Sequence, residues 1–135
     1  MTRCSTRPGV VAKGFSQVAD IDYHETFSPT ARMTSIRMLL QLAVAESLKV
    51  HQLDFDSAYL NAEIDCEIYM EPPELFPCNR PSEVLKIKKS LYGLKQSGRL
   101  WNEMLHAYLV EKNFTRSLVD TCVYTQFNEE PVKPS

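Results

Sequence analysis

The spacing of apolar residues changes at Lys49, and this change constrains the fold more than any other feature of the sequence. From about Ser35 to Leu48, apolar side chains recur three and four positions apart, which predicts a helix that buries this stripe in a core. From His51 to Asp56, apolar and polar residues alternate, which predicts a strand carrying two carboxylates on one face. The chain therefore contains both helical and strand periods.

Other segments extend this pattern. A second helix is predicted from Ser97, as its capping residue, to about Lys112, with Asn113 as a left-handed terminator. The first helix has Thr34 or Ser35 available as its cap. The order of elements implies an α+β fold in which helices cover one face of an antiparallel sheet. The further predicted strands are Val10–Phe15, Glu67–Glu71, Val84–Lys89 and Thr121–Phe127, the middle two forming a hairpin.

Length and charge narrow the class of protein. At 135 residues one domain is expected, and no apolar run approaches the roughly 18 residues of a membrane span, so no membrane partner is predicted. The net charge of −2 hides a run from residue 86 to residue 99 that has no acid and contains aromatic Tyr92. Such a run suits phosphates and stacked bases, and its simpler interpretation is a solvated basic loop. Its basic residues are Lys86, Lys88, Lys89, Lys95 and Arg99.

Cysteine and histidine give no metal motif. The four cysteines lack a CxxC pair and the three histidines are scattered, so free thiols are the simpler interpretation. Residues 1–8 are polar and basic, without the apolar stretch of a secretory signal. We therefore expect an intracellular, reducing location, in the cytoplasm or alternatively in the nucleus.

Asp54 is the clearest candidate for chemistry. An acid between Leu53 and Phe55 in a half-buried strand needs a positive partner, which could be a lysine, an arginine or a divalent cation. Mg²⁺ is commonly held by one or two carboxylates together with substrate phosphates. Taken alone, both Asp54 and Asp56 are more simply explained as surface or salt-bridged acids.

Several separated segments resemble the reverse transcriptase domain of copia-type retrotransposon polyproteins. They occur in the family's order, and KSLYGLKQ alone is already fairly specific. The resemblance covers about residues 9–125. The matching segments are VVAKGFSQ at 10–17, IDY at 21–23, ETFSP at 25–29, ARMTSIR at 31–37, HQLD at 51–54, AYLN at 58–61, EIYME at 67–71 and KKSLYGLKQS at 88–97.

The resemblance implies a palm-and-fingers polymerase that copies RNA or DNA into DNA with two Mg²⁺ or Mn²⁺ ions. Asp54 matches the family's first catalytic aspartate, which binds both ions while the primer 3′ hydroxyl attacks the incoming nucleotide. The backbone carbonyl of Phe55 is implied as a lesser metal ligand. The implied partners are an RNA/DNA template–primer, deoxynucleoside triphosphates and the rest of the Pol polyprotein.

The same resemblance assigns further contacts. Tyr59 matches a ring under the sugar that excludes a ribonucleotide 2′-OH, its alternative being an ordinary core aromatic. Tyr92 and Gly93 belong to a turn that packs on the nucleotide, where glycine permits close backbone approach. Lys13 belongs to the strand that contacts the triphosphate. The implied template and primer contacts are Lys88, Lys89, Lys95, Ser97 and Arg99.

Three departures bear on activity. The family's second metal motif, a tyrosine, a variable residue and two aspartates, is missing, and no Asp-Asp pair occurs in the sequence. Gly9 replaces an arginine of the fingers, and Gly98 replaces a proline.

A truncated palm sheet should also leave Leu53, Phe55, Val123 and Tyr124 partly exposed, so that the chain binds a hydrophobic dye and self-associates.

Three hypotheses remain open. In the preferred one, residues 1–8 are a non-matching leader, 9–125 are the fingers and part of the palm, and 126–135 are a mobile tail, the whole being a fragment that is inactive alone. In the second, a longer polyprotein or a partner chain supplies the missing aspartates to a working enzyme. In the third, the chain is a non-catalytic module derived from a retroelement that binds nucleic acid or protein.

Overall fold

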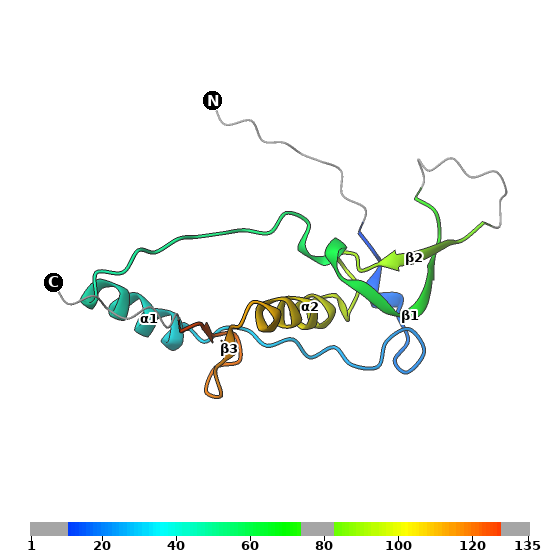
Figure 1. Ribbon diagram of the computed structural model, residues 1–135. Coiled ribbons are helices and arrows are strands. Elements are labelled where there is room, and N and C mark those ends of the chain that lie inside the picture. The colour runs from blue at the N-terminus through cyan, green and yellow to red at the C-terminus, as the bar shows by residue number, and fades with distance from the viewer. Residues whose placement is uncertain (1–10, 74–82, 128–135) are drawn as a thin grey trace, which may run out of the picture. The chain divides into compact units, whose positions relative to one another are not determined.

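The structure, a computed structural model, describes residues 11–73 and 83–127 (Figure 1). Its helices and strands form an α+β arrangement, as predicted, but the strands form two separate two-stranded antiparallel sheets and not the single sheet that the sequence predicts. The leader at 1–8 and most of the tail at 126–135 lie outside the described residues. The helices are α1 (Met33–Ala45) and α2 (Ser97–Glu111), with short 3₁₀ helices at Gly14–Ser16 and Ala58–Asn61, and the strands are β1 (Glu63–Met70), β2 (Leu85–Lys89), β3 (Thr115–Arg116) and β4 (Tyr124–Thr125).

The chain divides into two compact units, which we describe separately. The first unit contains residues up to 27 and residues 56–101, and the second contains residues 28–55 and those from 102 onward. Helix α2 begins in the first unit and ends in the second.

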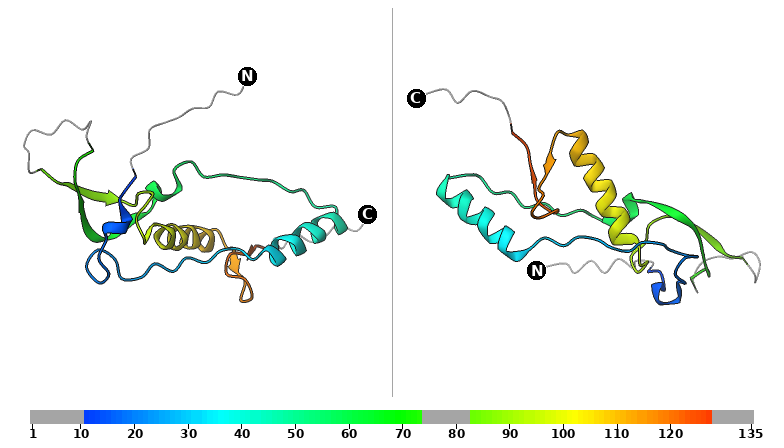
Figure 2. Two further views of the ribbon diagram at one scale, coloured as in Figure 1. Left: turned by 180° about the vertical axis from the view of Figure 1, so that it is seen from behind. Right: turned by 90° about the horizontal axis from the view of Figure 1, so that it is seen from below.

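Strands β1 and β2 form an antiparallel hairpin, drawn in green shades in Figure 2. The core of the first unit is built on this hairpin. Ile68 lies opposite Ile87 in the antiparallel register, and both side chains are buried with Leu94. This confirms the predicted hairpin, because alternation placed one apolar face on each strand. β1 starts earlier than predicted, at Glu63, and its register shifts between Glu63 and Ile68. The apolar residues packed around this core are Ala12, Ile64, Cys66, Met70 and Leu91.

Helix α2 and its terminator are also confirmed. Asn113 has a φ of 63°, the left-handed conformation that a C-terminal asparagine tolerates. The next residue closes the helix, because the Phe114 N–H donates to the Leu109 carbonyl at 3.0 Å.

The second sheet is smaller than the sequence predicts. Of the predicted strand Thr121–Phe127, only Tyr124–Thr125 is a strand, and it pairs with Thr115–Arg116, which was not predicted. The turn between them is held by backbone hydrogen bonds, such as that of the Ser117 N–H to the Val123 carbonyl at 2.9 Å, and by side chains, such as the Arg116 Nε, which donates to the Thr121 carbonyl at 2.7 Å.

Helix α1 forms close to the predicted range, but it ends at Ala45, before Leu48, and its N-cap is Arg32, without a side-chain cap, and not Thr34 or Ser35. The prediction that its apolar stripe is buried is also wrong. Ile36 is 40% exposed and Val44 is 81% exposed, and no residue of α1 is buried. Periodicity specifies which face is apolar, and burial additionally requires an element that covers this face. Within the described ranges, no element buries it.

Two predicted strands are absent. The segment Val10–Phe15 instead contains the 3₁₀ helix Gly14–Ser16, Val10 itself lying outside the described residues. Residues 51–55 have no regular structure and make no ladder with another described segment, so alternation alone did not produce a strand. Leu53 and Phe55 are accordingly 86% and 53% exposed, and Val123 and Tyr124 are half-buried, as expected for these four side chains.

Candidate nucleotide and nucleic-acid interface

The turn that joins β2 to α2 is held by a backbone crossing. The Ala12 N–H donates to the Tyr92 carbonyl at 2.9 Å. Gly93 has a φ of 100°, and a Cβ at this position would lie 2.2 Å from the Ala12 carbonyl oxygen. A Cβ at Gly14 would in turn lie 1.8 Å from the Gly93 carbonyl oxygen. Glycine is therefore required at both positions so that the two backbones can touch.

This crossing changes the reason for the glycine in the turn. The family resemblance predicts that Gly93 allows close approach of a ligand, whereas its close neighbour in the structure is the segment Ala12–Gly14 of the chain itself. Contact of Gly93 with a nucleotide stays a prediction. The crossing brings Lys13, which is exposed, beside this turn.

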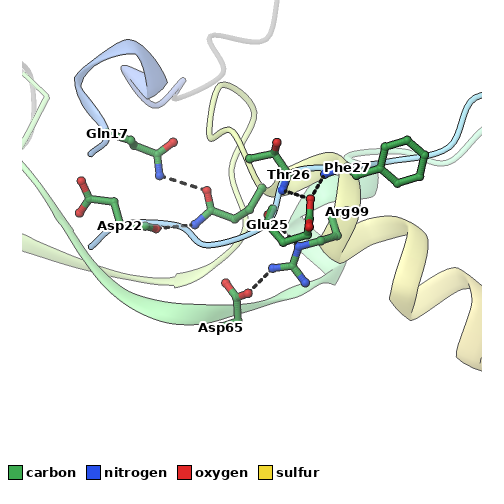
Figure 3. Close-up of polar contacts among 8 residues, drawn as sticks. Gln17, Asp22, Glu25, Thr26, Phe27, Asp65 and Arg99 are labelled. Carbon is green, nitrogen blue, oxygen red and sulfur yellow. Dashed lines mark hydrogen bonds and ion pairs between the residues drawn. The ribbon is translucent and has the colours of Figure 1, made fainter. Parts of the chain in front are cut away.

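Two glutamines lock the same crossing (Figure 3). The Gln17 Nε2 donates to the Gln96 Oε1 at 3.0 Å, and the Gln17 Oε1 accepts the Lys95 N–H at 2.8 Å. Gln96 is fully buried, and its Nε2 donates to the Asp22 carbonyl at 2.9 Å. A buried amide is tolerated only when its polar atoms have partners, and both atoms of Gln96 have one.

Two of the predicted nucleotide contacts lie together. The rings of Tyr59 and Tyr92 have centroids 5.9 Å apart and planes tilted by 32°. Tyr59 belongs to the 3₁₀ helix Ala58–Asn61 and is half-buried, whereas Tyr92 is 67% exposed. The pair thus presents an aromatic surface next to Gly93, of the kind on which a base or sugar can pack.

The basic side chains of the predicted template contacts differ in whether other side chains of the described chain bind them. Lys88 and Lys89 are exposed on β2, and no hydrogen bond or ion pair engages their side chains within the described chain. They border a shallow hollow of about 260 Å³ with an apolar floor that includes Ile87 and Leu91. The Lys95 Nζ donates to the Tyr23 hydroxyl at 3.2 Å and lies 5.0 Å from the centre of that ring. Lys86 is paired with Glu67, and this contact lowers the pKa of Glu67.

The other two predicted template contacts face inward. Ser97 is buried, and its Oγ donates to the Leu91 carbonyl at 2.6 Å while accepting from the Ser90 hydroxyl. Arg99 is bonded to Asp65 and to the Glu25 carbonyl (Figure 3). Both assignments as template contacts stay predictions.

Asp54 lies in the second unit, in the irregular segment that follows α1. It is exposed, and its Oδ1 accepts the N–H of Phe55 at 3.0 Å. Residues 11–73 and 83–127 contain no group of three or more side chains of histidine, cysteine, aspartate or glutamate that could hold a metal ion. By itself, this donor set does not fit a pair of divalent cations.

Comparison with known proteins decides the family. Residues 2–132 match the family model described as "Reverse transcriptase (RNA-dependent DNA polymerase)". The chain belongs to this reverse transcriptase family. The match covers nearly the whole chain and confirms the resemblance inferred from the motifs.

The relatives of this reverse transcriptase chain are copia-type retrotransposon polyproteins. It is 43% identical over 116 residues to the "Retrovirus-related Pol polyprotein from transposon TNT 1-94" of Nicotiana tabacum, covering 85% of this chain and 9% of that protein. It is 42% identical over 116 residues to the polyprotein from transposon RE1 of Arabidopsis thaliana, covering 85% and 8%. It is 36% identical over 111 residues to the "Transposon Ty1-H Gag-Pol polyprotein" of Saccharomyces cerevisiae, covering 78% and 6%.

The reverse transcriptase chain therefore spans less than a tenth of the length of these relatives. No solved structure matches it significantly. Among the described residues, no helix has the length and apolar character needed to cross a membrane.

Sequence reasoning missed four residues that organise the structure. They are Gln17, Gln96, Asp65 and Asp120, and each makes a side-chain contact with a residue at least 34 positions away. Gln17 and Gln96 end two of the matched motifs, VVAKGFSQ and KSLYGLKQ, which was the available signal. Asp65 gave no local signal, because residues 63–70 contain no basic side chain that could pair with it.

Proposed function

We propose that this chain is the N-terminal portion, residues 9–125, of the reverse transcriptase domain of a copia-type Pol polyprotein. In the complete domain it would take part in adding deoxynucleotides to a primer on an RNA or DNA template. The palm-and-fingers arrangement of that domain is part of the proposal. The 135-residue chain alone is proposed not to polymerise.

One observation carries the proposal. The crossing of Ala12–Gly14 over Gly93, together with the ring contact of Tyr59 with Tyr92, gathers four predicted nucleotide contacts in the first unit, namely Lys13, Tyr59, Tyr92 and Gly93. A lysine, a pair of aromatic rings and an open backbone turn are the groups that a triphosphate, a sugar and a base require. These residues come from three segments that are far apart in sequence, and the fold joins them.

Metal binding is proposed only in part. Members of the reverse transcriptase family generally use divalent metal ions. Asp54, with the Phe55 carbonyl, is our candidate ligand, and Mg²⁺ or Mn²⁺ would supply charge neutralisation at the phosphates in the complete domain. Because the sequence contains no Asp-Asp pair, the remaining ligands would have to come from a longer polyprotein or a partner chain.

Primer extension tests the proposal. The 135-residue chain and a version extended through a Tyr-X-Asp-Asp hairpin are compared on an RNA template with Mg²⁺ and with Mn²⁺. We expect extension products only from the longer chain. Products from the 135-residue chain would overturn the proposed inactivity, and no products from either chain would count against its being part of a working domain.

A second function, binding of nucleic acid without catalysis, is favoured by Lys88 and Lys89 on β2, whose exposed side chains have no partner among the residues that the structure describes. Cations without protein partners can release counterions from a phosphate backbone, which makes the affinity depend steeply on salt. Fluorescence anisotropy of a labelled RNA–DNA duplex at several salt concentrations measures this affinity. An affinity that Asp54→Ala leaves unchanged, in a longer chain that still fails to extend primers, would favour this function over polymerisation.

A further inference from the structure

Arg99 joins three segments that are distant in sequence. It lies in the first turn of α2, its Nε donates to the Glu25 carbonyl at 2.9 Å, and its Nη2 is paired with the Asp65 carboxylate on β1 (Figure 3). All three residues belong to the first unit. The guanidinium is planar and offers donors in a fixed fork, so one side chain can satisfy a carbonyl and a carboxylate at once.

The surroundings of this cation differ from those of a surface ion pair. The Arg99 side chain is 13% exposed and that of Asp65 is 35% exposed, whereas Lys86 and Glu67, which also pair on the hairpin, are 48% and 69% exposed. A cation withdrawn from water must keep a fixed counter-charge and hydrogen-bond acceptors. Asp65 and the Glu25 carbonyl provide these, so the guanidinium is engaged inside the protein.

Hydrogen bonds within residues 25–27 also order the segment that Arg99 holds. Glu25 folds back so that its Oε1 accepts the N–H groups of Phe27 and Thr26, each at 2.9 Å. These hydrogen bonds, with a smaller contribution from the Arg99 charge, lower the pKa of the Glu25 carboxyl. The carboxylate therefore stays ionised at neutral pH, and the backbone at Glu25 is fixed where Arg99 meets it.

The same segment leads back to the predicted nucleotide-facing turn. Residues 17–23 contact this turn through Gln17 on Lys95, Gln96 on the Asp22 carbonyl, and Lys95 on Tyr23. Arg99 adds a further contact, at the Glu25 carbonyl, which lies beyond residues 17–23 in the first segment, just as Arg99 lies beyond Lys95 and Gln96 in the second. Release of Arg99 would therefore free one end of the segment that supports the turn Tyr92–Gln96.

We propose that Arg99 is a positioning residue, which anchors the segment 22–27 and strand β1 to the start of α2 and so holds the turn Tyr92–Gln96. Its charge is neutralised internally, and the cations that meet nucleic-acid phosphates are Lys88 and Lys89. This differs from the sequence-based prediction that Arg99 contacts the template. The statement about Lys88 and Lys89 rests on the proposed function, whereas the positioning role of Arg99 does not.

The first test needs no nucleic acid. Arg99→Lys keeps the charge but loses the fork, and Asp65→Asn leaves Arg99 in place while removing its partner. We expect each to raise the unfolding equilibrium constant about tenfold or more and to shift the amide NMR signals of Lys95 and Tyr23. The matched control is Glu67→Gln, which removes one charge from the same strand and should change the constant only about twofold, with both signals unmoved.

The second test measures the salt dependence of affinity for an RNA–DNA duplex. Lys88→Gln combined with Lys89→Gln should reduce the slope of log affinity against log salt by about two, and Arg99→Gln should leave it unchanged in protein that is still folded. A slope reduced by about one in Arg99→Gln, together with wild-type stability and NMR signals in Arg99→Lys, would overturn the positioning role. If the wild-type chain binds no duplex, the proposed binding by Lys88 and Lys89 fails, and the first test still decides the role of Arg99.

Discussion

The Asp120 carboxylate accepts the backbone N–H of Arg32 at 2.9 Å, 88 positions away in the chain. Asp120 is buried, and it also bonds the Ser35 side chain and the Cys122 N–H. Arg32 is the N-cap residue of α1, so one of the free N–H groups at the start of this helix is satisfied by a carboxylate from another segment. The negative charge also interacts favourably with the positive end of the helix dipole.

This contact predicts an acid-sensitive second unit. The hydrogen bonds from Ser35, Arg32 and Cys122 lower the pKa of Asp120. A carboxyl whose folded pKa is lowered stabilises the fold above its ordinary pKa, and this contribution is lost as the pH falls below the ordinary pKa and through the lowered folded pKa. Melting curves followed by circular dichroism should show a lower Tm for Asp120→Asn at pH 7. The difference from wild type should shrink at low pH, and a constant difference would contradict this explanation.

The crossing at Gly93 predicts a strong effect of one added methyl group. Gly93→Ala places a Cβ against the Ala12 carbonyl and imposes a positive φ on alanine, so we expect a loss of about 1–3 kcal/mol in the free energy of unfolding. Urea titration measures this change. Gly98→Ala is the control, because Gly98 lies within α2 and has no positive φ, and alanine there should not destabilise. Equal effects of the two substitutions would contradict the crossing.

The buried amide of Gln96 predicts a second loss. Gln96→Leu leaves the Asp22 carbonyl and the Gln17 side chain without their partner, which should cost about 1–3 kcal/mol of unfolding free energy. The control is Gln52→Leu, at an exposed position, which should change stability by less than about 0.5 kcal/mol. A tolerated Gln96→Leu would show that the glutamine pair does not hold the crossing.

The uncovered face of α1 predicts dye binding and self-association by the purified chain. Leu40 is 50% exposed and Val44 is 81% exposed, and the two lie four positions apart on the same apolar face of this helix. Exposed apolar patches of this kind bind hydrophobic dyes and other copies of a protein. Val44→Glu should reduce both dye fluorescence and sedimentation of oligomers. A monomeric chain that does not increase the fluorescence of the dye would contradict the exposure of this face.

These features separate what local sequence could and could not predict. The hairpin of β1 and β2 and the helix α2 were predictable because alternation, helical spacing and Asn113 are local signals. The strand expected at 51–56 failed because alternation identifies a face but not a pairing partner. The contacts of Gln17 with Gln96 and of Asp120 with Arg32 join residues 79 and 88 positions apart, and no local pattern encodes such separations.

The candidate site was predicted in the same uneven way. Resemblance to the family pointed to Tyr59, Tyr92 and Gly93, and the structure brings the two rings to 5.9 Å. Charge in the sequence grouped Arg99 with Lys88 and Lys89, because composition does not distinguish an exposed cation from one that is paired internally. The internal partner, Asp65, was visible only after folding.

The most direct test of the central claim is primer extension by a chain lengthened through the Tyr-X-Asp-Asp hairpin, comparing Asp54→Asn with Asp56→Asn. Our account predicts that Asp54→Asn lowers the rate about a hundredfold or more, because a metal ligand is lost, whereas Asp56→Asn remains near wild type. Folding of both variants is checked by circular dichroism. Full activity of Asp54→Asn, or equal losses in the two variants, would contradict the assignment of Asp54 as the metal-binding carboxylate of this reverse transcriptase segment.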